Sequence, residues 1–413
     1  MAIETRCCIA GGGPAGMMLG FLLARMGADV VVLEKHGDFL RDFRGDTIHP
    51  STLQLMFELG LLSDFLSRPH QEVREVAGNI GGHQVKLGDF THLPTHSKFL
   101  ALMPQWDFLN FLVEHGRQYS GFNIRMSTQA TGLIEEGGRV VGLAANGPEG
   151  PLEIRTPLVI AADGRHSVLR ERARLPVRDL GAPMDVLWLR MSRRAGDPEQ
   201  TLGYIAPGKL FVMLNREDYW QCGYIIPKGA LDGMKSAGIE RFREEIAALE
   251  PVLRDRVSEL RDWNDVSLLT VKVDRLEQWW KPGFLCIGDA AHAMSPIGGV
   301  GINLAVQDAV AAANILGTKI VARTVSVHDL AAVQRRRMFP TRLTQGLQLL
   351  IQNNVVRQVL ASKDSFPVPW PVKLMQRWAW LRRIPARIIG VGFRPEHIRT
   401  PEIVTGGEQA VRS

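Results

Sequence analysis

Cysteine is scarce in this chain, and the few cysteines present follow no pattern typical of a metal site or a disulfide framework. Only four occur among 413 residues, and no CxxC spacing is present. Three of them lie in apolar, strand-like runs, where a free cysteine behaves as a small hydrophobic residue. The sequence therefore predicts no metal site, no disulfide bond and a reducing, cytoplasmic environment.

Clusters of basic residues and long hydrophobic runs are also missing. The formal net charge is +6, but no lysine- or arginine-rich block with interleaved aromatic residues occurs, so we expect no nucleic-acid partner. Glycine and proline interrupt the two longest uncharged stretches, residues 7–24 and 290–307, and neither predicts a membrane span. Because Glu4 and Arg6 lead directly into a strand, we expect no signal peptide.

Glycine, in contrast, is abundant and regularly spaced near the N-terminus. The stretch CCIAGGGPAGMMLGFLLARMGADVVVLEKH predicts a buried strand, a glycine turn, a helix and a second buried strand. Gly11, Gly13 and Gly16 have the spacing that allows a tight turn, close approach of a pyrophosphate and close helix–strand packing. The helix N-terminus offers free N–H groups to phosphates, and Glu34 can accept hydrogen bonds from ribose hydroxyls. The pattern predicts a dinucleotide site without choosing between FAD and NAD.

Two further segments combine a strand, a glycine–aspartate pair and a helix. The first is PLVIAADGRHSVLRERA, with Asp163 and Gly164 after the strand, and the second is GFLCIGDAAHAMSPIGGVGINLAVQDA, with Gly288 and Asp289. A domain that binds only NAD needs no such additional segments. Their presence favours FAD.

Together, these three motifs resemble the single-component FAD-dependent aromatic monooxygenases, typified by para-hydroxybenzoate hydroxylase. The resemblance covers most of the first 340 residues, in the order found in that family. It implies an α/β fold with a Rossmann-like FAD-binding domain, an inserted antiparallel β-sheet substrate domain and C-terminal helices. It also implies that FAD, with NADH or NADPH as transient electron donor and O2, hydroxylates an aromatic or otherwise electron-rich hydrophobic molecule through a flavin C4a-hydroperoxide.

Two other functions stay open at this point. One is a reductase or dehydrogenase of the same fold, acting on an isoprenoid or a quinone without oxygen insertion. The other is a non-catalytic flavin-binding protein.

The resemblance also assigns cofactor-binding residues. Asp289 is expected to bind the ribityl–pyrophosphate portion, and the glycine loop 296–301 lets backbone lie against the isoalloxazine ring. The helix that follows points N–H groups at the part of the ring that gains negative charge on reduction. Arg44 and Gln105 can instead be an exposed loop arginine and an exposed glutamine at a helix start, and these alternatives stay open. The expected FAD-binding residues are Gly11, Gly13, Ala15, Gly16, Glu34, Lys35, Arg44, Gln105, Asp163, Gly288, Asp289, Gly299, Gly301, Ile302 and Asn303.

The pattern changes to strand alternation between residues 175 and 265, where the substrate domain is expected. The runs MDVLWLRM, KLFVML and YWQCGYIIP predict antiparallel strands, the last two as a hairpin. By alternation Tyr224 and Gln221 face opposite sides, so only one of them faces the substrate. The substrate-side candidates are Pro296, His49 and Gln221, although ordinary buried polar roles stay open for the last two. The predicted division is 1–72, 98–175 and 266–340 for the FAD-binding domain, 73–97 and 176–265 for the substrate domain, and 341–413 for a C-terminal helical segment.

The end of the chain is basic and contains several tryptophans. Residues 377–387 hold four arginines, and weak contact with a membrane surface is one interpretation. The other is a terminal helix packed on the FAD-binding domain. The three consecutive arginines at 335–337 predict a solvated helix face, and we expect a monomer or a homodimer.

Overall fold

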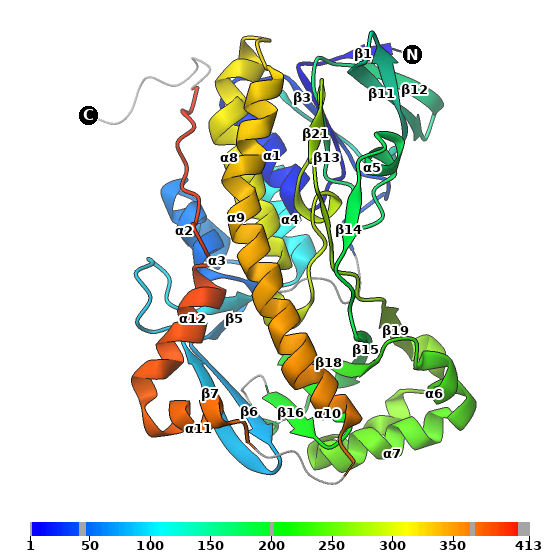
Figure 1. Cartoon of the computed structure of the whole chain (residues 1–413), viewed down its shortest axis with the longest axis vertical. Coiled ribbons are helices and arrows are strands. Elements are labelled where there is room, and N and C mark those ends of the chain that lie inside the picture. The colour runs from blue at the N-terminus through cyan, green and yellow to red at the C-terminus, as the bar shows by residue number, and fades with distance from the viewer. Residues whose placement is uncertain (1, 41–46, 199–201, 364–367, 404–413) are drawn as a thin grey trace.

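A six-stranded sheet lies in the upper part of the view in Figure 1, in the computed structural model, which describes residues 2–40, 47–198, 202–363 and 368–403. All neighbouring strands in it are parallel except the first pair. The inner strands are apolar and buried because helices and a second sheet pack against them. The order is β21 (Trp280–Lys281), β22 (Phe284–Cys286), β13 (Val159–Ala161), β2 (Cys7–Ala10), β3 (Val30–Leu33) and β9 (Phe122–Arg125).

Several helices contribute to the hydrophobic core around this sheet, among them α1, α4, α8 and α9. Helix α1 packs against α4 and α8, and α8 packs against α9, the long helix that runs down the molecule in Figure 1. The stretch Ile297–Val321 is long and apolar enough to cross a membrane, but two-thirds of its most apolar window is buried inside the protein. It is therefore a core helix. The bounds are α1 (Pro14–Arg25), α4 (Gln105–Gly116), α8 (Gly301–Val321) and α9 (Val327–Ile351).

A four-stranded sheet packs against the same core. Val140, Leu143 and Ile154 are its buried contributions. Its strands are β1 (Ala2–Glu4), β12 (Gly150–Arg155), β11 (Arg139–Gly147) and β10 (Gln129–Glu136).

A seven-stranded sheet lies at the other end of the molecule (Figure 1). It contains the predicted hairpin of β17 and β18, and all pairs are antiparallel except β16 with β6. Helices α6 (Leu231–Ala237) and α7 (Ile239–Leu249) lie beside it. The order is β19 (Val266–Leu269), β15 (Met184–Ser192), β18 (Tyr219–Pro227), β17 (Lys209–Asn215), β16 (Leu202–Ala206), β6 (Glu75–Ile80) and β7 (His83–Asp89).

Short elements connect the two large sheets. One small sheet joins β4 to β8 and β5, and another pairs β14 with β20. The bounds of these strands and of the nearby helices are β4 (Thr47–Ile48), β8 (Leu100–Leu102), β5 (Gln71–Val73), β14 (Val177–Asp179), β20 (Asp274–Leu276), α2 (Pro50–Glu58), α3 (Leu62–Leu66) and α5 (Val168–Arg172).

The C-terminal helices pack on the seven-stranded sheet. The segment after α12 then runs back toward the core around the six-stranded sheet. Helices α11 (Trp370–Arg377) and α12 (Arg383–Gly390) contact β7, and α10 (Arg357–Ala361) contacts β17 and β18. Trp370 and Trp380 stay exposed, so weak membrane contact stays a prediction. The α/β fold class is confirmed, whereas the exact domain division stays a prediction.

Candidate functional site

The three glycine motifs meet at one edge of the six-stranded sheet. Strands β22, β13, β2 and β3 are adjacent and parallel, with Cys286, Ala161, Ala10 and Leu33 in register at their ends. The carboxyl ends of parallel strands lie at the same edge, which is where open α/β sheets bind ligands. The next residues along each strand therefore form a row: Gly288 and Asp289, Asp163, Gly11, and Glu34.

The N-terminal glycines show the steric roles that the spacing predicts. Gly11 has φ +109°, and a Cβ there would lie 2.3 Å from the carbonyl oxygen of Ala162. A Cβ on Gly16 would lie 1.9 Å from the carbonyl oxygen of Gly11, so only glycine fits at this helix–strand contact. Around Gly13, in contrast, no atom of the described residues lies within 4 Å of the position of a Cβ. The open surface at Gly13 fits the close approach of a pyrophosphate.

Carboxylates border this cradle. Glu34 is buried, and its two oxygens accept hydrogen bonds from the N–H groups of Gly12 at 3.2 Å and His36 at 3.0 Å. Asp289 faces Arg165 at 3.4 Å, and about 30% of each side chain is exposed. Lys35, the residue after Glu34, is exposed. A fixed carboxylate near the ribose position and a partly open Asp289 fit a dinucleotide.

Asp163 is half-buried, and its carboxyl group has spare hydrogen-bonding capacity. Burial raises the pKa of Asp163. Its Oδ2 accepts a hydrogen bond from the N–H of Leu169 at 3.3 Å, while Oδ1 is buried with no partner among the described residues. Arg165, two residues later, was not singled out from the sequence, because only the fold brings it to Asp289.

The glycine loop leads into helix α8. Its 3₁₀ turn, Ile297–Gly299, includes Gly298 with φ +78° and Gly299 with φ +62°, conformations that favour glycine. The first N–H groups of α8, from Gly301 to Asn303, have no partner within the helix. Its first turn contains no acidic residue. The arrangement can therefore accept negative charge, as expected for the pyrimidine side of a reduced flavin.

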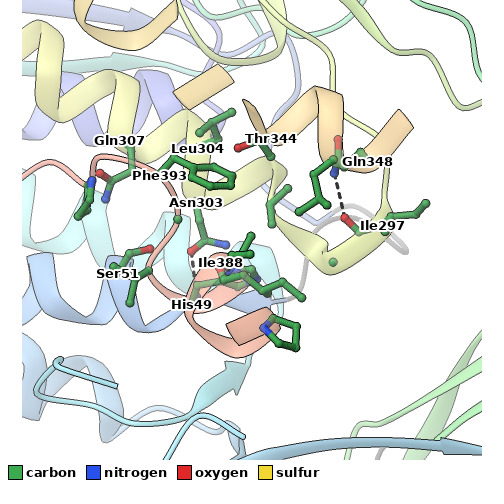
Figure 2. Close-up of a pocket in the computed structure, with 18 of the residues that line it drawn as sticks. His49, Ser51, Ile297, Asn303, Leu304, Gln307, Thr344, Gln348, Ile388 and Phe393 are labelled. Atoms are coloured by element: carbon green, nitrogen blue, oxygen red, sulfur yellow. Dashed lines mark hydrogen bonds between the residues drawn. The ribbon is translucent and has the colours of Figure 1, made fainter. Parts of the chain in front are cut away.

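Asn303 has a structural role that the sequence did not indicate. Its Oδ1 accepts a hydrogen bond from the N–H of His49 at 2.8 Å (Figure 2). The same oxygen accepts a second hydrogen bond from the Thr52 hydroxyl at 2.7 Å. Its Nδ2 donates to the carbonyl oxygen of Thr47 at 3.1 Å. The side chain thus joins the start of α8 to β4 and α2, which leaves the backbone N–H for a ligand.

His49 is fully buried and lines a cavity of about 270 Å³ between α8, α9 and α12 (Figure 2). Its Nδ1 lies 2.7 Å from the carbonyl oxygen of Ile389. Burial lowers the pKa of His49 to about 4, although the carbonyl groups of Ile389 and Gly298 favour the charged ring. The imidazole is therefore neutral near pH 7. Pro296 and Gln221 do not line this cavity, so the three substrate-side candidates are not brought together there.

Side chains along β18 alternate between the two faces of the sheet, and only one of these faces packs against α7. Cys222 and Tyr224 point into the core cluster shared with α7, and the Tyr224 hydroxyl donates to Glu245 at 2.9 Å. Gln221 and Gly223 lie on the opposite face, where Trp188 packs over Gly223. Gln221 is buried and accepts a hydrogen bond from Arg216 Nε at 3.1 Å. Of Gln221 and Tyr224, only Gln221 lies on the face away from α7, so only Gln221 remains a candidate for substrate contact on that face.

A network of buried charged side chains contacts the segment that contains Gly288 and Asp289. Asp308 on α8 accepts hydrogen bonds from the N–H of Gly288 at 3.0 Å, from His292 Nε2 at 2.5 Å and from Arg337 Nε at 2.8 Å. Arg337 also pairs with Glu396 at 3.4 Å. The prediction of a solvated arginine face was wrong for Arg337, which is 1% exposed. The available signal was an aspartate inside an otherwise apolar helix.

The remaining predictions concern residues with fewer contacts. Gln105 is the first residue of α4 and is half-buried. Ala15 and Ile302 are buried, with Ala15 close to Gly288. Arg44 lies outside the described residues. Within the described ranges, no group of three or more His, Cys, Asp or Glu side chains could hold a metal ion.

Comparisons with known proteins agree with this geometry. A family model described as an FAD binding domain matches residues 4–346. Over 351 residues the chain is 33% identical to 6-methylpretetramide 4-monooxygenase of Streptomyces rimosus, covering 84% of this chain and 83% of that enzyme. It is 25% identical to dialkyldecalin synthase of Streptomyces rugosporus, covering 73% of this chain but only 63% of that longer relative.

The fold also matches a solved structure. The crystal structure of pqsL, a probable FAD-dependent monooxygenase from Pseudomonas aeruginosa, superposes with a TM-score of 0.73 at 19% identity. The match covers 87% of this chain and 98% of that one. At this identity, the likeness concerns the fold alone.

Proposed function

The chain belongs to the FAD-binding family of flavin-dependent aromatic monooxygenases, and from this premise we propose that its substrate is a polycyclic aromatic compound of the polyketide type. FAD is the cofactor, and with NAD(P)H and O2 it supplies the oxygen-activating chemistry when bound. The observation that carries the substrate proposal is the 33% identity to 6-methylpretetramide 4-monooxygenase over most of both chains.

We propose that the cradle at the sheet edge holds FAD. The backbone at Gly11 and Gly13 and the N-terminus of α1 take the pyrophosphate, and Glu34 takes the ribose. Asp289 takes the ribityl–pyrophosphate portion. The backbone from Gly299 to Asn303 lies against the ring and offers N–H groups to it. The open surface at Gly13, the partly exposed Asp289 and the first N–H groups of α8 support this assignment.

The substrate is proposed to lie against the face of the seven-stranded sheet that carries Trp188, Gln221 and Gly223. The ring of Trp188 offers a flat apolar surface, and the Gln221 amide offers polar contacts to a ring substituent. Pro296 contributes the wall between this face and the flavin. The chain's own contribution is to bind and orient the substrate, to exclude water, and to place N–H groups where the flavin becomes negative.

A panel of compounds tests this proposal. The flavin-loaded enzyme is mixed with NADH or NADPH and with 6-methylpretetramide, 4-hydroxybenzoate or a prenyl-chain lipid, while NAD(P)H oxidation and O2 uptake are recorded. We expect 6-methylpretetramide to stimulate both and mass spectrometry to show a product that has gained one oxygen atom. Stimulation by the prenyl lipid alone, with a gain of two hydrogens and no O2 uptake, would establish the reductase alternative instead.

Two matched variants test the substrate face. Gln221→Leu is expected to raise KM about fivefold for the aromatic substrate, because a net hydrogen bond contributes roughly 1 kcal/mol. Tyr224→Phe removes a hydroxyl on the opposite face of the same strand and should leave KM unchanged. Equal effects of both substitutions would exclude this face as the substrate site.

A further inference from the structure

The cavity that contains His49 is separate from the proposed substrate face. All of its lining residues belong to the ranges 49–51, 297–307, 337–351 and 375–395, on α2, α8, α9, α12 and their adjoining loops (Figure 2). None of these ranges contributes a strand to the seven-stranded sheet. The cavity borders the glycine loop and the start of α8 through Ile297, Gly298, Val300 and Asn303. Its main apolar walls are Leu304, Leu347, Ile388 and Phe393.

Two buried polar atoms at this cavity lack a hydrogen-bond partner among the described residues: Nε2 of His49 and Nε2 of Gln307. The carbonyl group of Gly298 also lies near the imidazole of His49, but it makes no hydrogen bond to Nε2. The first atom is therefore an acceptor when the neutral ring carries its proton on Nδ1, which faces the carbonyl oxygen of Ile389. The second is a donor, because Oε1 of Gln307 already accepts from the N–H of Glu396. His49 is 0% and Gln307 5% exposed. Buried polar atoms are nearly always hydrogen-bonded, so these two atoms point to a ligand.

We propose that this cavity is an accessory binding site for a flat aromatic molecule that carries a hydroxyl group. The hydroxyl donates to His49 Nε2, and an oxygen of the ligand accepts from Gln307 Nε2. The aromatic rings contact Phe393 and the aliphatic walls. An apolar cavity of about 150 Å³ stays dry and takes up benzene, so a cavity of about 270 Å³ has room for a larger aromatic guest. A ligand without polar groups would leave both polar atoms unpaired.

His49 orients this ligand and does not deprotonate it. A phenol has a pKa near ~10, and the pKa of His49 is lowered by burial to about 4. Proton transfer from the phenol to the ring is therefore disfavoured roughly a millionfold. The ligand stays a neutral hydrogen-bond donor.

A ligand in the cavity should restrain the glycine loop, because α9 both lines the cavity and binds the start of that loop. From α9, Gln348 Nε2 donates to the carbonyl oxygens of Ser295 and Ile297, both at 2.9 Å. Thr344 and Leu347, on the preceding turn of α9, line the cavity. A ligand that packs between them and Ile297 restrains the loop that follows Pro296. We therefore expect binding to perturb the flavin absorbance spectrum.

Equilibrium dialysis of the flavin-loaded full chain against 2-naphthol tests the site. Leu347→Trp fills the cavity, and Leu350→Trp is the matched control, because Leu350 lies on the same helix with 60% exposure. We expect Leu347→Trp to weaken 2-naphthol binding at least tenfold and Leu350→Trp to leave it unchanged. Phe393→Ala is a second variant that should also weaken binding if Leu347→Trp does not fold. Equal affinity in the wild type, Leu347→Trp and Phe393→Ala would overturn the proposal, as would no binding at all.

The hydrogen bond to His49 has its own test. 2-Methoxynaphthalene lacks the hydroxyl proton and should bind about tenfold more weakly than 2-naphthol, a preference that His49→Phe should abolish. Equal binding of the two probes to the wild type would refute this contact. If the natural occupant is the enzyme's own aromatic substrate, initial rates should depart from a hyperbola at high substrate concentration in the wild type but not in Leu347→Trp. If the wild type and Leu347→Trp both give hyperbolic rates while 2-naphthol binding depends on Leu347, the occupant is an aromatic hydroxyl compound other than the substrate.

Discussion

Asp308→Asn removes the central charge of the buried network beneath Gly288. Asp308 is 0% exposed and accepts three hydrogen bonds, from Gly288, His292 and Arg337. Burial alone would raise the pKa of Asp308, but His292 and Arg337 hold it below its ordinary value. The substitution therefore leaves the Arg337 guanidinium, which is 1% exposed, with only the longer contact to Glu396.

Breaking a buried ion pair by removing one partner costs about 3–5 kcal/mol. Asparagine keeps one acceptor oxygen for Gly288 or His292, so we expect the lower end, about 3 kcal/mol, in urea unfolding followed by tryptophan fluorescence. Glu136→Gln is the control, because its pair with Arg155 is exposed and should contribute below about 1 kcal/mol. FAD affinity should fall about tenfold as the N–H of Gly288 loses its charged acceptor.

The pKa of Asp308 fixes the direction in which folding stability changes with pH. Because the folded pKa of Asp308 is depressed, its contribution is present above the unfolded value of about 3.9 and is lost as pH falls through the folded pKa. The wild type should therefore lose more stability than Asp308→Asn when the pH is lowered below about 4. A loss of less than 1 kcal/mol in Asp308→Asn at pH 7 would mean that Asp308 and Arg337 are not paired in solution, and the reasoning would fail.

Three further outcomes follow from the site. Gly16→Ala should abolish FAD binding or folding, because a Cβ there would lie 1.9 Å from the Gly11 carbonyl oxygen, whereas Gly132→Ala, with open space around it, should bind FAD normally in a fluorescence titration. Asp289→Asn should lower the flavin content of the purified protein, and full retention of the yellow colour would exclude Asp289 as a ligand. For His49, the folded pKa of about 4 lies below the unfolded value of 6.5, so stability is lost as pH falls from 6.5 toward 4. His49→Phe should reduce that loss by about 3 kcal/mol in urea titrations at pH 7 and pH 4.

The dinucleotide site was predictable because its signals are local. Strand, glycine turn and helix follow one another within thirty residues, and Glu34 ends the next strand. Parallel strands then bring their carboxyl ends together whatever lies between them, so Gly11, Asp163 and Gly288 had to meet once they were assigned to one sheet. The same reasoning explains why the hairpin of β17 and β18 was predicted from alternation alone.

The charge network was not predictable, because its partners are far apart in the sequence. Gly288, Asp308, Arg337 and Glu396 come from a loop, two helices and the tail, and no local pattern joins them. Three consecutive arginines at the surface of a helix are typical of a solvated face, and one of the three is buried only because α8 presents Asp308 to it. For the same reason, the sequence left open which face of β18 meets the α7 core cluster, since alternation fixes two faces without saying what packs on each.

The tail after α12 belongs to the core of the FAD-binding part rather than to a separate appendage. Glu396 is 6% exposed, and its carboxylate pairs with Arg336 and Arg337 on α9. Farther along, the carbonyl oxygen of Thr400 accepts from Arg25 at the end of α1. The same segment closes the cavity through Phe393. Since Arg337 connects this tail to Asp308, and Asp308 connects to the N–H of Gly288, the tail and the segment Gly288–Asp289 share one set of buried charges. Any change that displaces the tail must therefore both open the cavity and leave Arg337 with Asp308 but without Glu396.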